Sequence, residues 1–154
     1  MINGINSREM ILEILLEIEE GEHSHVAIRN ALSKYQFLPK QDRAFITRVC
    51  EGTLEYRIQI DYIINSFSKV TVDKMKPAIR EILRSAVYQL KYMDSVPDSA
   101  VCNEAVKLAQ RKGFYNLKPF VNGVLRTIAR EMDQVRFPQK EDDLLKYLSV
   151  KYSM

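Results

Sequence analysis

Apolar residues recur every three or four positions along most of this chain, which is the spacing of one face of an α-helix. The first such stretch begins at Asn6, which has the spacing of a capping box with Glu9. It ends at Gly21, a residue that can adopt the left-handed conformation that closes a helix. A shorter stretch follows from Ser24, which we expect to act as its cap, and ends before Pro39.

Prolines and glycines divide the remaining sequence. The apolar pattern over residues 40–67 is too long for one typical globular helix, so we expect a break between Gly52 and Arg57. Further helices are expected to begin at Pro77, at Pro97, near Phe120 and near Glu141. Seven or eight amphipathic helices joined by short connections predict a single all-α bundle, because each apolar face needs another face to leave water.

The composition agrees with one helical domain. Of 154 residues, 46% are hydrophobic and 28% are charged, which excludes the apolar deficit typical of disordered chains. Cys50 and Cys102 belong to no Cys-x-x-Cys pair, so we expect two buried thiols rather than a zinc site or a disulfide framework. The acidic N-terminus does not resemble a signal peptide, and no apolar run approaches the roughly 18 residues that span a bilayer. We therefore expect a cytoplasmic protein with no membrane partner.

No catalytic motif is evident. The chain contains no G-x-G-x-x-G loop, no Walker A loop and no G-x-S-x-G elbow. His23 and His25 form an H-x-H pair, but no nearby carboxylate or cysteine completes a metal-ligand set, so we expect a structural role for them. The chain is therefore expected to be non-catalytic and to hold neither a metal nor a cofactor of its own.

The basic residues carry the candidate chemistry. The net charge of +3 is uneven, because residues 1–38 hold three basic and six acidic side chains whereas residues 103–137 hold seven basic and three acidic ones. Like charges lie four positions apart in three pairs, an arrangement that costs about 0.2–0.5 kcal/mol per pair in an isolated helix. The pairs are Arg80 with Arg84, Lys107 with Arg111, and Arg126 with Arg130. Either neighbouring acids such as Glu81, Glu104 and Asp133 offset this charge, or the phosphates of an RNA do so.

Cations and aromatic residues alternate ahead of the helix near Phe120. Such a mixture can stack on unpaired bases while it holds phosphates, as single-stranded RNA requires. Phe120 itself begins an apolar stripe and is expected in the core. Tyr115 and Lys118 lie in a predicted loop and are the better candidates for an exposed contact.

Several segments resemble the NusB-like family, in the order that the family has them. They are Asp42-Arg43-Ala44-Phe45, Glu51-Gly52-Thr53-Leu54, the Pro77 helix with Ile82-Leu83-Arg84, Val96-Pro97, Asn103 to Ala109, and Phe120-Val121-Asn122-Gly123-Val124-Leu125-Arg126. The resemblance implies an all-α fold of two small helical bundles, and it implies RNA binding. In the last segment we expect Asn122 and Gly123 to be packing devices, with Asn122 bonded to a backbone group and Gly123 facing a close neighbouring helix.

The family contains two kinds of protein that this chain could resemble in function. Antitermination factors usually open with several arginines on the first helix and bind a leader RNA together with a ribosomal protein, whereas only Arg8 matches that cluster here. The chain is more similar to the N-terminal modules of ribosomal RNA cytosine-C5 methyltransferases. Arg126 matches the residue of those modules better than it matches the acid that is common in antitermination factors.

We therefore expect an RNA-binding domain over residues 1–147 and the start of a linker over 148–154. The linker would lead to a methyltransferase domain that uses S-adenosylmethionine and acts on small-subunit ribosomal RNA. The expected RNA contacts are Arg8, Tyr115, Lys118, Arg126 and Arg130. A standalone antitermination factor, or a helical docking module that binds no RNA, remains an alternative.

Overall fold

The computed structural model describes residues 6–135, and within them it contains seven α-helices and three short 3-10 helices but no strand. The α-helices are α1 (Ser7–Glu19), α2 (Ser24–Lys34), α3 (Lys40–Glu55), α4 (Arg57–Phe67), α5 (Pro77–Tyr92), α6 (Asp98–Arg111) and α7 (Lys118–Glu131). The 3-10 helices are η2 (Val72–Lys74), η3 (Tyr115–Leu117) and η4 (Met132–Gln134). The predicted all-α fold is confirmed, and the helix expected near Glu141 lies outside the described residues.

Local sequence signals set most helix boundaries. The backbone N–H of Glu9 donates to Asn6 Oδ1 at 2.8 Å, so Asn6 caps α1 as predicted. Gly21 follows α1 with a φ of 116°, and the expected break between α3 and α4 falls at Tyr56. The predicted cap of α2 was wrong, because Ser24 is its first helical residue and makes no cap, while the cap position belongs to His23.

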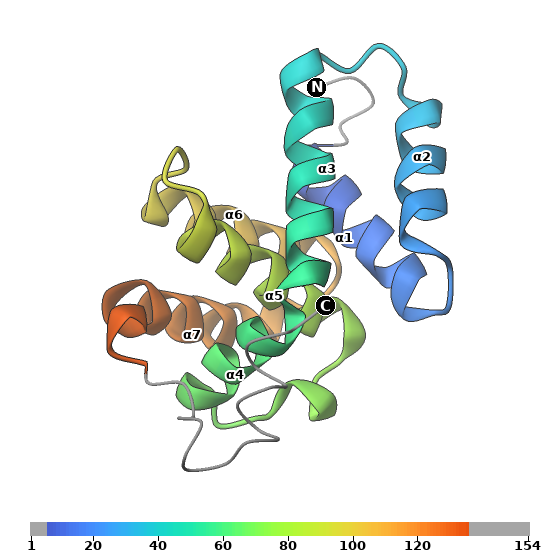
Figure 1. Ribbon diagram of the computed structural model, residues 1–154. Coiled ribbons are helices and arrows are strands. Elements are labelled where there is room, and N and C mark those ends of the chain that lie inside the picture. Colours follow the sequence, from blue (N-terminus) through green and yellow to red (C-terminus); the bar gives the residue numbers. More distant parts are fainter. Residues whose placement is uncertain (1–5, 136–154) are drawn as a thin grey trace, which may run out of the picture.

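The molecule is arranged around α5, which contacts α1, α3, α4, α6 and α7 (Figure 1). Helices α1, α2 and α3 pack together on one side of α5, and α4, α6 and α7 pack on the other. This agrees with the two small bundles that the family resemblance implied. Every residue from Glu81 to Leu90 is buried, so α5 is surrounded by its neighbours for most of its length.

The core is one continuous apolar cluster to which all seven helices contribute. Cys50 and Cys102 are free thiols with no exposed surface, as the sequence predicted. Burial raises the pKa of both thiols, which keeps them protonated. Within residues 6–135, no helix is both long enough and apolar enough to cross a membrane.

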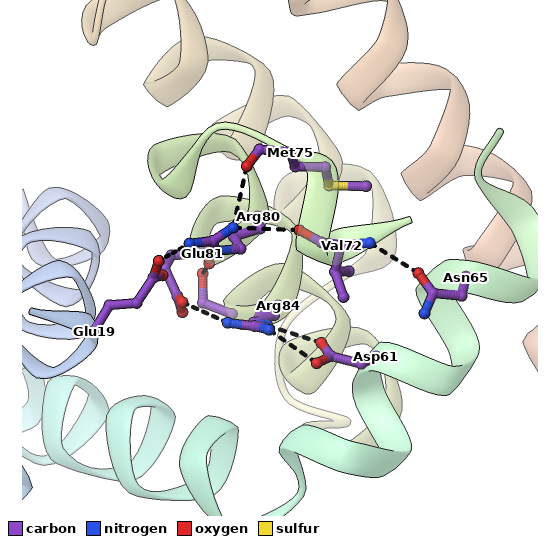
Figure 2. Close-up of polar contacts among 9 residues, drawn as sticks. Glu19, Asp61, Asn65, Val72, Met75, Arg80, Glu81 and Arg84 are labelled. Atoms are coloured by element: carbon purple, nitrogen blue, oxygen red, sulfur yellow. Dashed lines mark hydrogen bonds and ion pairs between the residues drawn. The ribbon is translucent and has the colours of Figure 1, made fainter. Parts of the chain in front are cut away.

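The two bundles are joined by charged side chains on α5 (Figure 2). Arg84 donates from Nε and Nη2 to the two carboxylate oxygens of Asp61 on α4, at 2.8 and 2.9 Å. Its third nitrogen, Nη1, donates to Glu81 at 2.6 Å. Arg80 forms an ion pair with Glu19 at the end of α1. The pair Arg80 and Arg84 is therefore neutralised by neighbouring acids, and it does not need a phosphate partner.

Two carboxyl groups meet in this network. Glu81 has 4% of its surface exposed, and burial raises its pKa to about 8. Burial also acts to raise the pKa of Glu19, but hydrogen bonds with Arg80 and Glu81 outweigh that effect and lower it to about 2. Glu19 Oε2 is buried and has no donor among the described residues. Because the pKa of Glu81 is raised and that of Glu19 is lowered, Glu81 is the carboxyl group of this pair that favours its protonated form.

Close packing between α3 and α5 requires a glycine at Gly52, whereas such a requirement was expected at Gly123. A methyl group added at Gly52 would lie 2.1 Å from Cζ of Tyr88, which is buried and stacks on Tyr92. Gly52 therefore allows α5 to approach α3. At Gly123 an added methyl group meets nothing within 4 Å, so the expected close approach of a helix there was wrong.

Substitution of these glycines should have opposite effects on stability. We expect Gly52→Ala to lower the free energy of unfolding by about 1–3 kcal/mol, because Tyr88 must move within a packed core. Gly123→Ala is the matched control and should raise it by up to about 1 kcal/mol, because alanine is the better helix former at an open position. Urea denaturation of both variants measures the difference. Equal destabilisation by the two variants would contradict this account.

The raised pKa of Glu81 predicts a pH dependence of stability. Because the pKa of Glu81 rises from 4.5 to about 8 on folding, the folded state holds a proton that the unfolded state has lost between those values. Its stabilising contribution is present below pH 4.5 and is lost as the pH rises through about 8, at up to about 1.4 kcal/mol per pH unit for one proton. Glu81→Gln keeps a donor for Glu19 and an acceptor for Arg84, so the variant should flatten urea-denaturation stability between pH 5 and 8. An unchanged slope would show that Glu81 is ionised in the folded protein.

Candidate nucleic-acid interface

Polar side chains join α6 and α7 along an outer surface of the molecule. Arg126 Nη2 donates to Asn103 Oδ1 at 2.7 Å, and Lys118 Nζ donates to Gln110 Oε1 at 2.7 Å. The later residue of α6 pairs with the earlier residue of α7, so the two helices run antiparallel, side by side (Figure 1). We call this surface the α6–α7 seam, formed by Asn103, Gln110, Lys118, Asn122 and Arg126.

The charge of the seam is concentrated in two residues. Arg126 and Lys118 donate to neutral amides, and no carboxylate among the described residues lies within ion-pair distance of either. Lys107 and Arg130, which flank the seam, are each paired with an acid, Glu104 at 3.4 Å and Glu131 at 3.0 Å. The positive charge of Arg126 and Lys118 is therefore available to an anionic ligand.

An aromatic ring lies at one end of the seam. Tyr115 is 64% exposed, and Lys118 Nζ lies 4.8 Å from the centre of its ring. The prediction that both residues lie in a loop was wrong, because Tyr115 opens η3 and Lys118 is the first residue of α7. The start of α7 therefore fixes the position of the cation relative to the ring. Phe120 packs against the core, as predicted.

Arg130 lies one helical turn beyond Arg126 and exposes 67% of its side chain. Its ion pair with Glu131 joins neighbouring positions on the exposed surface, where such a pair is weak. Arg130 thus extends the line of cations on α7, although with part of its charge offset.

Arg8 does not join the other predicted contacts. Its Nη2 donates to Gln89 Oε1 on α5 at 3.2 Å, and its guanidinium lies 5.2 Å from the centre of the Phe45 ring on α3. Burial lowers the pKa of Arg8, and the negative charge of Glu104 opposes this shift. Arg8 therefore packs against α3 and α5, whereas Tyr115 lies on η3 and Lys118 and Arg126 lie on α7.

The basic pair Lys107 and Arg111 also has acidic partners within the protein. Arg111 lies 3.4 Å from Glu9, and the neighbouring Lys112 lies 3.1 Å from the same carboxylate. These contacts attach the end of α6 to α1. Among the three pairs of like charge found in the sequence, only Arg126 with Arg130 retains a cation without an acidic partner among residues 6–135.

The amide partners of the cations were not predicted. Asn122 Oδ1 accepts from Arg126 Nε at 3.1 Å, so the expected bond from Asn122 to a backbone group was wrong. Neither Asn103 nor Gln110 was predicted as a contact, although their spacing of seven places them on one face of a helix. That signal could have indicated a polar stripe, but the sequence did not show that α7 lies against it.

The histidine pair supports no metal site. His23 and His25 stack with ring centres 5.9 Å apart at the start of α2. Within the part of the chain that the structure describes, no group of three or more His, Cys, Asp or Glu side chains is placed to hold a metal ion.

Comparison with known proteins identifies the family. Residues 5–130 match the model of the NusB family. The chain belongs to the NusB family. The resemblance stated from the sequence segments is thereby confirmed.

Relatives of two kinds match this NusB-family chain. It is 35% identical over 124 residues to the probable ribosomal RNA small subunit methyltransferase B of Bacillus subtilis (strain 168), a match that covers 80% of this chain and 28% of that protein. It is 33% identical over 128 residues to the transcription antitermination protein NusB of Bacillus velezensis (strain DSM 23117 / BGSC 10A6 / LMG 26770 / FZB42), covering 82% of this chain and 95% of that protein. Matches to two such methyltransferases span only 28% and 29% of their lengths.

A solved structure supports the fold. The crystal structure of antitermination factors NusB and NusE in complex with dsRNA contains a chain that superposes with a TM-score of 0.74 at 21% identity. The match covers 80% of this chain and 93% of that one. At this identity the likeness establishes a common arrangement of helices.

Proposed function

We propose that this NusB-family chain is a non-catalytic RNA-binding module that helps a methyltransferase domain to engage small-subunit ribosomal RNA. The observation that carries the proposal is the α6–α7 seam, where Arg126 and Lys118 have no acidic partner among the described residues and an exposed Tyr115 lies beside Lys118. Two comparisons support the proposal. Some relatives are named as probable ribosomal RNA methyltransferases, and a chain of similar fold was solved in a complex with dsRNA.

The seam suits an RNA with unpaired nucleotides. Lys118 and Arg126 are eight residues apart on α7, which separates them by about 12 Å along the helix axis. This separation lets each cation hold a different phosphate. The ring of Tyr115 can stack on an unpaired base, a contact worth about 1–3 kcal/mol in single-strand binding proteins. Arg130 adds a weaker contact one turn beyond Arg126.

The first helix favours the methyltransferase model over the antitermination model. In α1 the exposed or half-exposed charged residues are mostly acids, among them Glu13, Glu17 and Glu19. Its one arginine, Arg8, is occupied by Gln89 and Phe45. In this proposal S-adenosylmethionine and the catalytic residues belong to a methyltransferase domain that follows residues 148–154, and the complete protein acts in the cytoplasm.

A transcription antitermination factor is the second candidate. The match to the Bacillus velezensis NusB protein covers 95% of that protein, so the described helices account for nearly all of such a factor. A docking module that binds no RNA is the remaining alternative, and a titration with RNA separates it from both.

Removal of the two unpaired cations should weaken RNA binding. We expect Lys118→Ala/Arg126→Ala to lower the affinity for a single-stranded fragment of small-subunit ribosomal RNA and to reduce the slope of log affinity against log salt by about 1.4, or about 0.7 for each phosphate that the variant no longer holds. Fluorescence anisotropy at several salt concentrations measures both. The matched control is Arg29→Ala/Lys34→Ala, which removes one arginine and one lysine from the exposed surface of α2. Equal losses of affinity in both variants would mean that the seam has no special role.

Dependence on a protein partner separates the two RNA-binding candidates. As a methyltransferase module, the chain should bind small-subunit ribosomal RNA equally well with and without NusE, the factor found with NusB in the solved complex. As an antitermination factor, it should bind a leader RNA much more tightly when NusE is present. Titration of both RNAs with and without purified NusE measures this difference. A strong increase confined to the leader RNA would overturn the methyltransferase proposal.

A further inference from the structure

An open groove lies on the outer face of α3, a helix of the bundle that does not contain α6 and α7 (Figure 1). Leu38 lines it ahead of the helix and Tyr56 after the helix, while Tyr88 of α5 reaches it beside Gly52. Its volume of about 770 Å³ lies within the roughly 300–1,000 Å³ of small-molecule sites. We call this hollow the α3 groove, and the charged residues that line it are Lys40, Arg43, Arg48, Glu51 and Glu55.

Tyrosine rings line the groove beside these charges. Tyr56 is half-buried, and its ring stacks on that of Tyr92 with the ring centres 4.5 Å apart. Tyr92 stacks in turn on Tyr88, with the ring centres 5.3 Å apart. Tyr56 and Tyr88 both line the groove, so a flat ligand that enters it meets aromatic side chains that hold one another in place. Unpaired bases stack on such rings in proteins that bind single-stranded RNA.

Two arginines of the groove are oriented by the ends of neighbouring helices. Arg43 Nη1 donates to the carbonyl oxygens of Leu32 and Tyr35 at the end of α2, at 3.0 and 3.1 Å. Arg48 Nη2 donates to the carbonyl oxygen of Tyr92 at the end of α5, at 3.0 Å. Neither arginine lies within ion-pair distance of a carboxylate among residues 6–135. Their remaining donors and their positive charge suit a phosphate group.

Glu51 is the free acceptor of the groove. It is exposed, and within the described chain no hydrogen bond or ion pair engages its carboxylate. Glu55, one turn further along α3, raises the pKa of the Tyr56 hydroxyl through its negative charge, which places that carboxylate beside the ring. An ionised carboxylate accepts hydrogen bonds through both oxygens and donates none. Glu51 therefore favours a ligand that presents two neighbouring donors.

We propose that the α3 groove binds one unpaired guanine nucleotide of an RNA, with the base against Tyr56, the Watson–Crick edge on Glu51 and the phosphate on Arg48. The inference rests on the proposed function for its ligand. It adds to the α6–α7 seam a second contact, on the other bundle, which selects a base.

The chemistry of the bases explains the choice of guanine. Its N1–H and N2–H2 groups are adjacent donors on the Watson–Crick edge, and they match the two oxygens of one carboxylate. Adenine and cytosine place a ring-nitrogen acceptor next to their amino group, and uracil flanks its N3–H with two carbonyl oxygens. Each of these three bases therefore brings an acceptor against the carboxylate. The Watson–Crick edge is accessible only in an unpaired nucleotide, which agrees with an RNA that has unpaired nucleotides at the seam.

Substitution of Glu51 by glutamine tests the proposal. Glu51→Gln keeps the length of the side chain but replaces one carboxylate oxygen by an NH2 donor, which opposes the donors of guanine. Fluorescence anisotropy compares 12-nucleotide oligo-A with the same strand carrying one central guanine or one central inosine, which lacks the N2 amino group. Wild-type protein should bind the guanine strand about tenfold more tightly than oligo-A, with the inosine strand between them. In Glu51→Gln the two affinities should agree to within about twofold.

The matched control is Glu20→Gln, which removes the same charge from an exposed position at the end of α1. It should leave the preference for guanine unchanged, because the preference is a ratio of two affinities in which general effects of charge cancel. Equal binding of oligo-A and the guanine strand by wild-type protein, or a preference that survives in Glu51→Gln, would overturn the proposal.

A titration with free nucleotides separates this inference from the proposed function. GMP, added to 15N-labelled wild-type protein, should shift the backbone amide signals of Arg48, Glu51 and Tyr56, and AMP at the same concentration should shift them much less. Such shifts in a protein that binds no RNA would refute the proposed function and support the guanine site. RNA binding without a preference for guanine would support the proposed function and refute the guanine contact to RNA, and shifts by GMP would then assign the groove to a free nucleotide.

Discussion

The structure depends on a charged helix at the centre of an apolar core. Ten consecutive residues of α5, from Glu81 to Leu90, are buried, and a helix in such a place is ordinarily apolar on all sides. Glu81, Arg84, Ser85 and Gln89 must therefore find partners, since a buried polar group without one is costly. Asp61 supplies the partner of Arg84 from α4, so the contact joins one bundle to the helix at the centre.

The same requirement explains the first helix. Glu19 at the end of α1 neutralises Arg80, and Arg8 near its beginning donates to Gln89. Both contacts attach α1 to α5 at points far apart along the two helices. Charges that resemble surface features in the sequence are thus used to orient the N-terminal bundle against the C-terminal one. In the more deeply buried pair Arg84–Glu81, removal of one member is more harmful than replacement of the whole pair by apolar residues.

The outer surface of α6 and α7 obeys a different rule. Here the cations have neutral amides as partners, which keep the side chains in place without cancelling their charge. The acids that accompany the basic residues of α5 are missing around Lys118 and Arg126 within the described chain. The contrast between neutralised cations inside and uncompensated cations outside is the physical reason for placing the candidate RNA contact on this surface.

Sequence alone determined the helices and their family, because local signals such as the Asn6 cap, Gly21 and Pro77 act within a few residues of one another. It also predicted Tyr115, Lys118 and Arg126 as candidate RNA contacts. Only the tertiary structure decided that Arg8, Arg80 and Arg84 are occupied by internal partners and that Gly52, not Gly123, permits a close approach. It alone brought Asn103 and Gln110 of α6 to the cations of α7. The partner of a side chain depends on which helices pack together and at what rotation, and the spacing within one helix does not contain that information.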